Sequence, residues 1–336
     1  MLTRRSLFAT GLALGSAGLL AACGGSDDSS SSGSGSGSDA GGADGVFPVT
    51  ISTLFGDVEV TEKPTRVVAL GWGDAETALS LGVQPVGASD WIAFGGEGVG
   101  PWAKGMYDKA PTIIETLEPD FEAIAALEPD LILDVKSAGD KDRYKRLSQI
   151  ATTVGVPKDG ANYLVSPKDQ LAIIGKALGA TSKADELQKG LDEQFSKVAD
   201  AHSDWKGKSV TVATKTSEGW GAYVEGETRL GFLENLGFTQ SKKVAALPTG
   251  DSGFSVSISA EQLDELDADL IVAFPIYIKT TEITDDKQWK QTPAVADGRA
   301  VVVDGDLSSA FSLGTVLAQE YALKQLPGKI EKALGS

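Results

Sequence analysis

The chain has 336 residues, 41% of them hydrophobic, and a formal net charge of −17 from 47 acidic and 30 basic side chains. A surface this acidic argues against binding to nucleic acid and against adsorption to anionic lipid. It also means that a site for an anionic ligand has to be a local basic island. With a single cysteine the chain has no internal disulfide, so packing has to supply the stability.

The first 22 residues are predicted to be an export signal. Arg4 and Arg5 precede an apolar stretch from Leu7 to Leu20, which is shorter than the roughly 18–20 apolar residues of a membrane-spanning helix. The paired arginines resemble the twin-arginine export pattern, and the general export route stays open. Removing residues 1–22 takes away these two positive charges and no negative one, so the net charge goes from −17 to −19.

A lipid anchor is predicted at Cys23. The run Leu20-Ala21-Ala22-Cys23 resembles the bacterial lipobox, after which the cysteine is acylated and becomes the mature N-terminus. Each buried acyl CH₂ contributes about 0.8 kcal/mol, so two or more chains hold a protein on the outer face of the cell membrane. The alternative is an unmodified thiol near a cleavage site. Residues 23–46 are almost all Gly, Ser, Asp and Ala, which predicts a flexible linker.

Residues 47–336 are long enough for two domains of ordinary size. Short β-branched runs alternate with helical patterns, which is typical of α/β units around a largely parallel sheet. A small hairpin is predicted from Val49–Thr53 and Asp57–Val60. The strands expected after it are Val67–Leu70, Pro85–Ala88, Leu131–Val135, Val210–Ala213, Leu270–Phe274 and Ala300–Val303.

The two halves of this region resemble each other. Glu122 precedes Asp130 by eight residues, and Glu261 precedes Asp269 by the same number. The repeat is too long for a solenoid and therefore predicts two similar lobes. Gly82 and Gly237 each follow a helical run, where a glycine commonly ends a helix.

A helical connector is expected between the lobes. Pro167 to His202 contains no strand candidate, and its apolar residues recur at helical spacing. Gly179 divides it, and the second helix, Ser182–Ala201, would span roughly 30 Å. The predicted fold is α/β, with two Rossmann-like lobes that have mainly parallel sheets and are joined by a long helix. The expected boundaries are residues 47–165 for the N-terminal lobe, 166–204 for the connector and 205–336 for the C-terminal lobe.

The runs Pro64–Leu70, Glu118–Ile132 and Trp289–Arg299 resemble the periplasmic binding proteins of the ferric-siderophore and cobalamin importers. They are most similar to the iron-siderophore receptors of Gram-positive actinobacteria, over essentially the whole chain after Gly45. The resemblance implies a monomer without catalysis or cofactor that binds an Fe(III) siderophore between its lobes. It also implies delivery to the permease of an ABC importer. Haem and cobalamin are the alternatives within the same fold.

The resemblance assigns permease docking to Glu122 and Glu261. One outward carboxylate on each lobe, paired with arginines of the permease, would make a two-point contact. The alternative is that each glutamate only stabilises its own helix, because an acidic residue in the first turn does so by about 0.3–1 kcal/mol through the helix dipole.

Two arginines are candidate ligand-binding residues. Arg229 matches the family's arginine that faces a negatively charged siderophore, where a guanidinium offers rigid donors. Its alternative is a surface ion pair with Glu225 or Glu227. Arg143 lies just beyond strand Leu131–Val135, and the carboxyl ends of strands line the cleft in α/β folds.

Other cations of the family pattern are missing. No arginine follows Leu270–Phe274, and no histidine lies near Asp251. This disfavours a purely tris-catecholate chelate and leaves mixed and hydroxamate chelates open.

Five aromatic residues are expected at the carboxyl ends of strands, where a stacking pocket would lie. The alternative for each is ordinary, partly buried packing. These candidates are Trp72, Trp91, Trp220, Tyr223 and Tyr277.

Direct metal binding and catalysis are not expected. His202 is the only histidine, and a site for bare zinc or manganese needs several histidines and carboxylates. No nucleophile–base pair is legible, which disfavours an enzyme. Haem would require an axial ligand such as Tyr107, Tyr223 or Tyr277. A surface adhesin or signalling sensor on the same scaffold is the remaining alternative.

Overall fold

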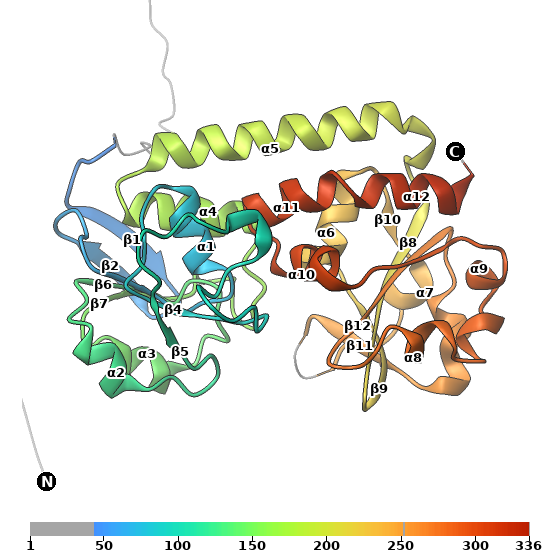
Figure 1. Ribbon diagram of the computed structural model, residues 1–336, viewed down its shortest axis with the longest axis horizontal. Helices are drawn as coiled ribbons and strands as arrows, with labels where there is room; N and C mark the ends of the chain where they lie inside the picture. The colour runs from blue at the N-terminus through green and yellow to red at the C-terminus, as the bar shows by residue number, and fades with distance from the viewer. Residues whose placement is uncertain (1–43, 251–252, 336) are drawn as a thin grey trace, which may run out of the picture. The chain divides into compact units, whose positions relative to one another are not determined.

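Two β-sheets, one from each half of the chain, organise the structure (Figure 1). The computed structural model describes residues 44–250 and 253–335, which lie in one compact unit. The two-lobe α/β fold expected from the sequence is therefore confirmed. The predicted signal, Cys23 and nearly all of the predicted linker lie outside the described residues.

The sheet of the N-terminal lobe is entirely parallel, in the order β5-β4-β3-β6-β7. Its strands are β3 (Val67–Ala69), β4 (Gly87–Ser89), β5 (Thr112–Ile114), β6 (Leu131–Leu133) and β7 (Thr152–Val154). Alternate side chains of β3 enter different cores, Val67 and Ala69 on one face and Val68 on the other. Burial on both faces explains why the central strands β3 and β6 are continuous apolar runs.

Helices cover both faces of this sheet. In Figure 1, α1 (Asp74–Ser80) and α4 (Pro167–Ala177) lie above it, and α2 (Phe121–Ala126) and α3 (Lys141–Leu147) lie below it. Asp120 and Asp140 cap α2 and α3 by accepting hydrogen bonds from backbone N–H groups of the first turn. A 3₁₀ turn, η1 (Pro101–Ala103), precedes β5.

The sheet of the C-terminal lobe is mixed, in the order β11-β9-β8-β12-β13, and β10 pairs with β8. Its strands are β8 (Ser209–Thr216), β9 (Gly219–Tyr223), β10 (Thr239–Gln240), β11 (Ser255–Ile258), β12 (Leu270–Pro275) and β13 (Ala300–Val302). The strands β9 and β11 run antiparallel to their neighbours and the others are parallel.

Short helices surround the second sheet, and three longer ones follow it. They are η2 (Ser203–Trp205), α6 (Thr228–Asn235), α7 (Lys242–Ala245), η3 (Ala260–Leu266), α8 (Thr281–Thr284), η4 (Trp289–Gln291), α9 (Pro293–Ala296), α10 (Gly305–Leu313), α11 (Val316–Leu323) and α12 (Leu326–Leu334). The predicted hairpin is present as β1 (Val49–Thr53) and β2 (Gly56–Val60), with Val49 opposite Val60.

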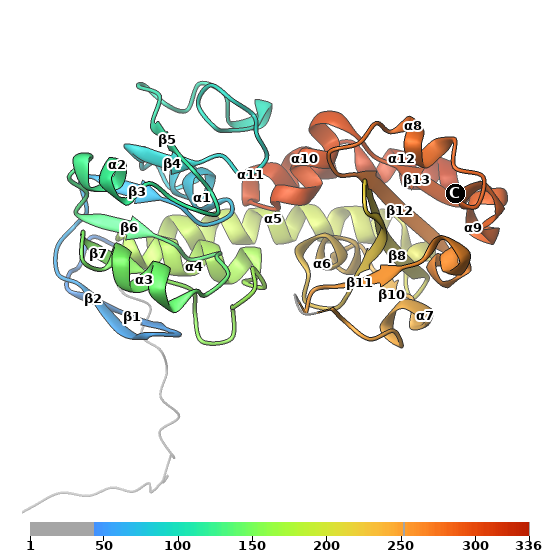
Figure 2. The same cartoon turned by 90° about the horizontal axis from the view of Figure 1, so that it is seen from below.

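The long connector helix is confirmed. Gly179, at φ +65°, separates α4 from α5 (Thr181–Ala201), and α5 runs across both sheets (Figures 1 and 2). Ala184, Leu191 and Phe195 form its buried stripe. The chain later returns, because α11 packs against both α5 and α1. One apolar cluster therefore contains residues of both lobes and the connector, and the lobe boundaries stay a prediction.

The sequence repeat marks a structural feature of both lobes. Asp130 accepts hydrogen bonds from the backbone N–H and hydroxyl of Thr65, at 2.7 Å each. Asp269 accepts the same two bonds from Ser209, at 2.7 and 2.8 Å. Each aspartate thus ties the entry of one central strand to the entry of its neighbour.

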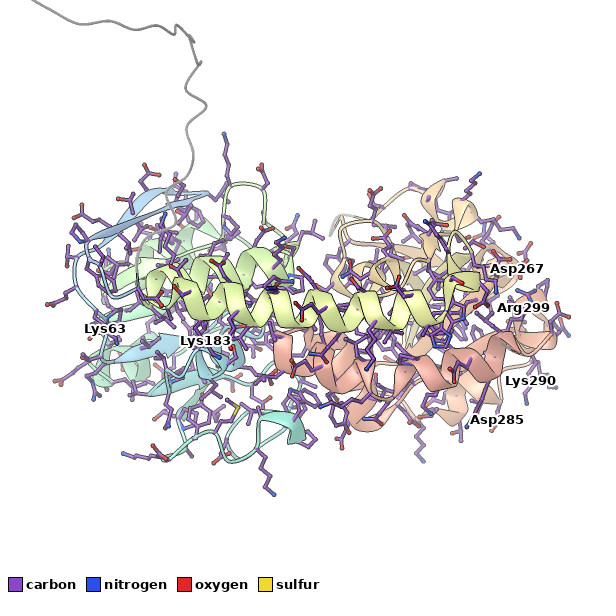
Figure 3. All side chains as sticks on the ribbon, turned by 90° about the horizontal axis from the view of Figure 1, so that it is seen from above. Lys63, Lys183, Asp267, Asp285, Lys290 and Arg299 are labelled. Carbon is purple, nitrogen blue, oxygen red and sulfur yellow. The ribbon has the colours of Figure 1, made fainter. Side chains whose placement is uncertain are left out.

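An arginine adds to this arrangement in each lobe. Arg66 donates to the carbonyl groups of Leu127 and Glu128. Arg299 donates to the carbonyls of Ala268 and Asp269, and it lies beside Asp267 (Figure 3). Side-chain hydrogen bonds therefore help to hold both loops that enter the central strands.

Several strands were not expected from the sequence. The strands β5, β7 and β10 are two or three residues long, too short for an alternating pattern, and β9 carries glycine at alternate positions. Tertiary pairing, rather than local preference, determines them.

We expect Asp269→Ala to lower the free energy of unfolding by about 1 kcal/mol at pH 7, because Ser209 loses two hydrogen bonds to a partly solvated carboxylate. Those bonds lower the pKa of Asp269, so its contribution is present above the ordinary aspartate pKa. It is lost as the pH falls through the lowered value. Urea unfolding followed by tryptophan fluorescence at pH 7 and pH 3 measures both effects. Asp264→Ala, on the exposed side of η3, should be neutral, and an equal loss there would contradict the assignment.

Candidate functional site

A pocket of about 770 Å³ opens in the N-terminal lobe beyond the carboxyl ends of β5 and β6. Its walls come from the first turns of α2 and α3 and from the loops that follow β4, β5, β6 and β7. Parallel strands deliver their following loops to the same edge of a sheet, which is where ligands bind in open α/β folds. All residues that line the pocket lie in the N-terminal lobe, so it is not the cleft between the lobes that the resemblance implies, and that cleft stays a prediction. Of the predicted ligand residues, the pocket brings together Trp91 and Arg143.

An aromatic wall borders the pocket. Trp91 lies between Trp72 and Tyr163, with ring centroids 5.6 and 5.5 Å away. The indole N–H of Trp91 donates to the Leu70 carbonyl at 2.8 Å, which fixes the ring over the end of β3. Tyr163 was missed by sequence reasoning. It sits at φ +64° in a loop without a helical or strand pattern, so no periodicity could point to it.

Arg143 reaches the pocket but is already paired. Its guanidinium makes a two-point contact with Asp134, at 2.8 and 3.3 Å, and donates to the Thr116 carbonyl at 2.7 Å. Its side chain is 12% exposed and that of Asp134 is 5% exposed. This ion pair joins α3 to the loops after β5 and β6, so Arg143 holds the shape of the pocket wall.

The mouth of the pocket carries more acid than base. Arg146 is the second lining arginine, and its guanidinium lies 3.6 Å from the centre of the Phe121 ring. The lining carboxylates are Glu118, Asp120, Glu122, Asp140 and Asp142. The sequence reasoning named only Glu122 among them, for a different role.

Arg229 lies in the other lobe, in the first turn of α6, and is buried. Its guanidinium is hydrogen-bonded to Glu227 and to Ser312, and it stacks 4.6 Å from the Tyr223 ring and 5.2 Å from the Phe274 ring. The predicted alternative of a pair with Glu227 is present, in the interior rather than on the surface. In this geometry the guanidinium donates its hydrogen bonds to other side chains of the protein.

Lys136 crosses from one lobe to the other. It follows β6, is 3% exposed, and its ammonium donates to the Thr228 hydroxyl of α6 at 2.7 Å. Burial lowers the pKa of Lys136 to about 8, although the nearby Glu227 acts in the opposite direction. Sequence reasoning missed this residue. Its position directly after a predicted strand was the available signal.

Two buried carboxyl groups on α1 connect the site to other elements. Asp74 accepts hydrogen bonds from the N–H groups of Val135 and Lys136 and from the Gln170 amide. Burial raises the pKa of Asp74 to about 6 despite these bonds.

Glu76 joins α1 to the N-terminus of α11. Its Oε1 accepts hydrogen bonds from the Trp102 indole, at 2.8 Å, and from the Thr315 hydroxyl. Its Oε2 is buried and has no hydrogen-bond partner within the described part of the chain. Burial raises the pKa of Glu76 to about 7, because an ionised carboxylate is poorly solvated there.

The remaining aromatic candidates lie away from the pocket. Trp220 and Tyr223 are inside β9, so the expectation that they follow the end of a strand was wrong. Both are buried, Trp220 stacked on Trp289 and Tyr223 on Phe274. Tyr277 does follow β12, but it is 93% exposed at φ +56°.

The two predicted docking glutamates occupy matching places. Glu122 is exposed in the first turn of α2, and Glu261 is exposed in the first turn of η3. Glu122 also lines the pocket. The docking candidate of the N-terminal lobe therefore lies on the rim of the candidate ligand site.

Direct metal ligation has no support in residues 44–250 and 253–335. They contain no group of three or more His, Cys, Asp or Glu side chains that could hold a metal ion. His202 stacks on Trp205, with centroids 3.9 Å apart, and lies 3.3 Å from Glu331.

The profile of the periplasmic binding protein family matches residues 67–307. This chain belongs to that family. Its members and solved neighbours are substrate-binding proteins rather than enzymes, so the expectation of a non-catalytic protein is confirmed.

Similar proteins come from several Gram-positive bacteria. A probable siderophore-binding lipoprotein of Bacillus subtilis, YfiY, is 28% identical over 80% of this chain and 82% of its own. The Streptococcus pneumoniae protein PiaA, solved with ferrichrome, has a TM-score of 0.73 at 26% identity and covers 85% of this chain and 98% of its own. Staphylococcus aureus SirA, solved with staphyloferrin B, has a TM-score of 0.71 at 26% identity over 84% and 98%.

We expect the free energy of unfolding to fall as the pH rises from about 4 to 7, because the folded protein binds more protons than the unfolded chain while Glu76 and Asp74 have raised pKa values. Glu76→Gln removes one of these two contributions. The variant should gain about 1–3 kcal/mol relative to the parent between pH 5 and pH 7.5. Urea unfolding across this range measures the gain. Glu59→Gln, an exposed change, should keep the parent's slope. If the unfolding free energy of Glu76→Gln changed with pH as steeply as that of the parent, the raised pKa of Glu76 would be refuted.

Proposed function

We propose that this protein binds a ferric siderophore in the pocket beside Trp91 and passes it to the permease of an ABC importer. The observation that carries the proposal is the aromatic-walled pocket of about 770 Å³ at the carboxyl edge of a parallel sheet. This is a volume typical of small-molecule sites. Relatives of this chain bind iron chelates, which supports the same class of ligand here.

Within this proposal, Trp91 and Tyr163 contact the organic part of the chelate, Trp72 packs against the Trp91 ring, and Arg143 keeps the wall in place. Stacking on aromatic faces needs no particular charge on the ligand. Trp220, Tyr223, Arg229 and Tyr277 do not line the described pocket, so a ligand bound there would not touch them, and their predicted contacts would require a different site.

Haem and cobalamin are the competing ligands. Haem would need an axial residue, and none of Tyr107, Tyr223 and Tyr277 lines the described pocket. Tyr163 does line it, but burial raises the pKa of Tyr163, which opposes its ionisation as a ligand. Burial raises the pKa values of Tyr107 and Tyr223, which opposes their ionisation as ligands.

We further propose that the protein is held outside the cell membrane by acylation of Cys23. The lipobox-like sequence and the lipoprotein names of relatives support this. No helix in residues 44–250 and 253–335 combines the length and apolarity that crossing a membrane requires.

A ferric siderophore should quench the tryptophan fluorescence of the full-length protein in detergent, and the quenching should come from Trp72 and Trp91. Fluorescence titrations of Trp91→Phe and Trp72→Phe should therefore show much smaller amplitudes than the parent protein. Trp220→Phe is the matched control, because that residue lies in a separate apolar cluster with Trp289. Its amplitude should equal the parent's.

A panel of ferric siderophores, haem and cobalamin decides the ligand class in the same assay. Tight binding of haem or cobalamin without binding of any iron chelate would overturn the proposed ligand. If Trp220→Phe lost as much quenching amplitude as Trp91→Phe, the ligand would instead bind outside this pocket.

Charge reversal at the docking candidates tests delivery. Glu122→Arg with Glu261→Arg should abolish iron-chelate uptake by cells, because two carboxylates that pair with a permease would become repulsive. Binding of an uncharged chelate by the purified variant should stay within about threefold of the parent, since a reversed charge on the pocket rim acts only weakly on a neutral molecule. Glu59→Arg with Asp200→Arg is the control and should leave uptake intact. Normal uptake by the Glu122/Glu261 variant would rule out this docking role.

A further inference from the structure

Three largely buried cations near the site are paired within the protein, whereas Arg146 on the pocket wall lies over the Phe121 ring and has no ion pair within the described residues. Arg143 is paired with Asp134, and Arg229 is paired with Glu227. Lys136 is 3% exposed, and its ammonium is turned to the Thr228 hydroxyl with Glu227 nearby. None of the three therefore presents an uncompensated positive charge to a bound molecule.

The charge that faces the pocket is negative. Five carboxylates line it against two guanidinium groups, and one of those two, that of Arg143, is cancelled by Asp134. The aspartates that cap α2 and α3 are fixed by backbone N–H groups, whereas Glu118 and Asp142 are exposed and accept no hydrogen bond within the described residues. A solute in this pocket meets a net negative field added to that of an acidic chain.

We propose that this pocket selects neutral or cationic ferric chelates, of the hydroxamate type, over anionic ones. The inference rests on the proposed siderophore-binding function and adds the charge class of the ligand. Three singly charged hydroxamates balance Fe(III) and leave a neutral complex. Three doubly charged catecholates leave a strongly negative complex, which this lining would repel.

The aromatic wall matches this selection. The rings of Trp91 and Tyr163 line the pocket and bind uncharged organic surface, and an aromatic face also attracts an ammonium group. The carboxylates at the mouth then lie where a pendant cation of the ligand would emerge. Apolar stacking and negative charge together favour a chelate that is compact, uncharged at the metal and positive at its periphery.

A charge series on one scaffold tests the proposal. Ferrioxamine B carries a free ammonium, its N-acetyl derivative is neutral, and its N-succinyl derivative is anionic, while the iron-binding hydroxamates are the same. The full-length protein in detergent should bind the cationic and neutral chelates at least about fivefold more tightly than the anionic one at low salt. The difference should shrink in about 0.5 M salt, where charges are screened within about 4 Å. A ferric tris-catecholate should bind more weakly than all three.

Variants locate the source of the preference. Glu118→Gln with Asp142→Asn should reduce the difference between the cationic and anionic chelates to about twofold or less, and it should tighten binding of the anionic one. Glu59→Gln with Asp185→Asn makes the same change in net charge away from the pocket and should keep the parent's preference.

Different results would overturn the charge selection and the siderophore-binding function. Equal or tighter binding of the anionic chelate by the parent protein would overturn the charge selection and leave siderophore binding standing. A preference unchanged in the Glu118/Asp142 variant would overturn the assignment to this pocket. Binding of none of the chelates would overturn the proposed function and the charge selection with it.

Discussion

The carboxylate of Asp74 holds together the loops on which the site is built. It is buried and accepts hydrogen bonds from the backbone after β6, at 2.7 Å from Val135, and from Gln170 of α4, also at 2.7 Å. The backbone at Gly71 is packed so closely that a Cβ there would lie 2.3 Å from Oδ2 of Asp74 and 2.8 Å from the backbone nitrogen of Lys136. This packing fixes the directions in which Trp72 and Lys136 leave the sheet. The aromatic wall and the cross-lobe contact both follow from it.

The lobes are joined by more than the long helix. Lys136 contacts Thr228, and Glu76 contacts Thr315 at the start of α11. Gly314 lies directly against Thr228, where a Cβ would approach the Thr228 methyl group to 2.2 Å. An apolar core shared by both lobes adds to these polar contacts. Such a junction opposes wide separation of the lobes, because separation would expose the shared apolar core to water and break the hydrogen bonds between the lobes.

In the proposed mechanism, the ligand and the permease both contact α2. The first turn of α2 contributes Glu122 to the pocket rim, and its N-terminal cap also lines the pocket. A chelate in the pocket would therefore lie next to a residue proposed to dock. The C-terminal lobe presents Glu261 at the matching place in η3 without a described pocket beside it. In this proposal the two similar lobes therefore differ, because only the N-terminal lobe has its docking glutamate beside the proposed ligand pocket.

The sequence by itself determined the two-lobe α/β fold, the hairpin, the α5 connector and the matched positions of Glu122 and Glu261, because these depend on local periodicity and on a repeat that is visible in the chain. It also placed Trp91 and Arg143 at the pocket, since residues just past a parallel strand gather at one edge. Tertiary structure alone decided what those residues do. Whether Arg143 and Arg229 carry free charge depends on Asp134 and Glu227, and whether Trp220 and Tyr223 reach the pocket depends on β9 turning back beside β8. Tyr163 joined the site through contacts with distant segments that no local pattern encodes. The position of Lys136 after a strand was visible in the sequence, but its contact with Thr228 of the other lobe was not.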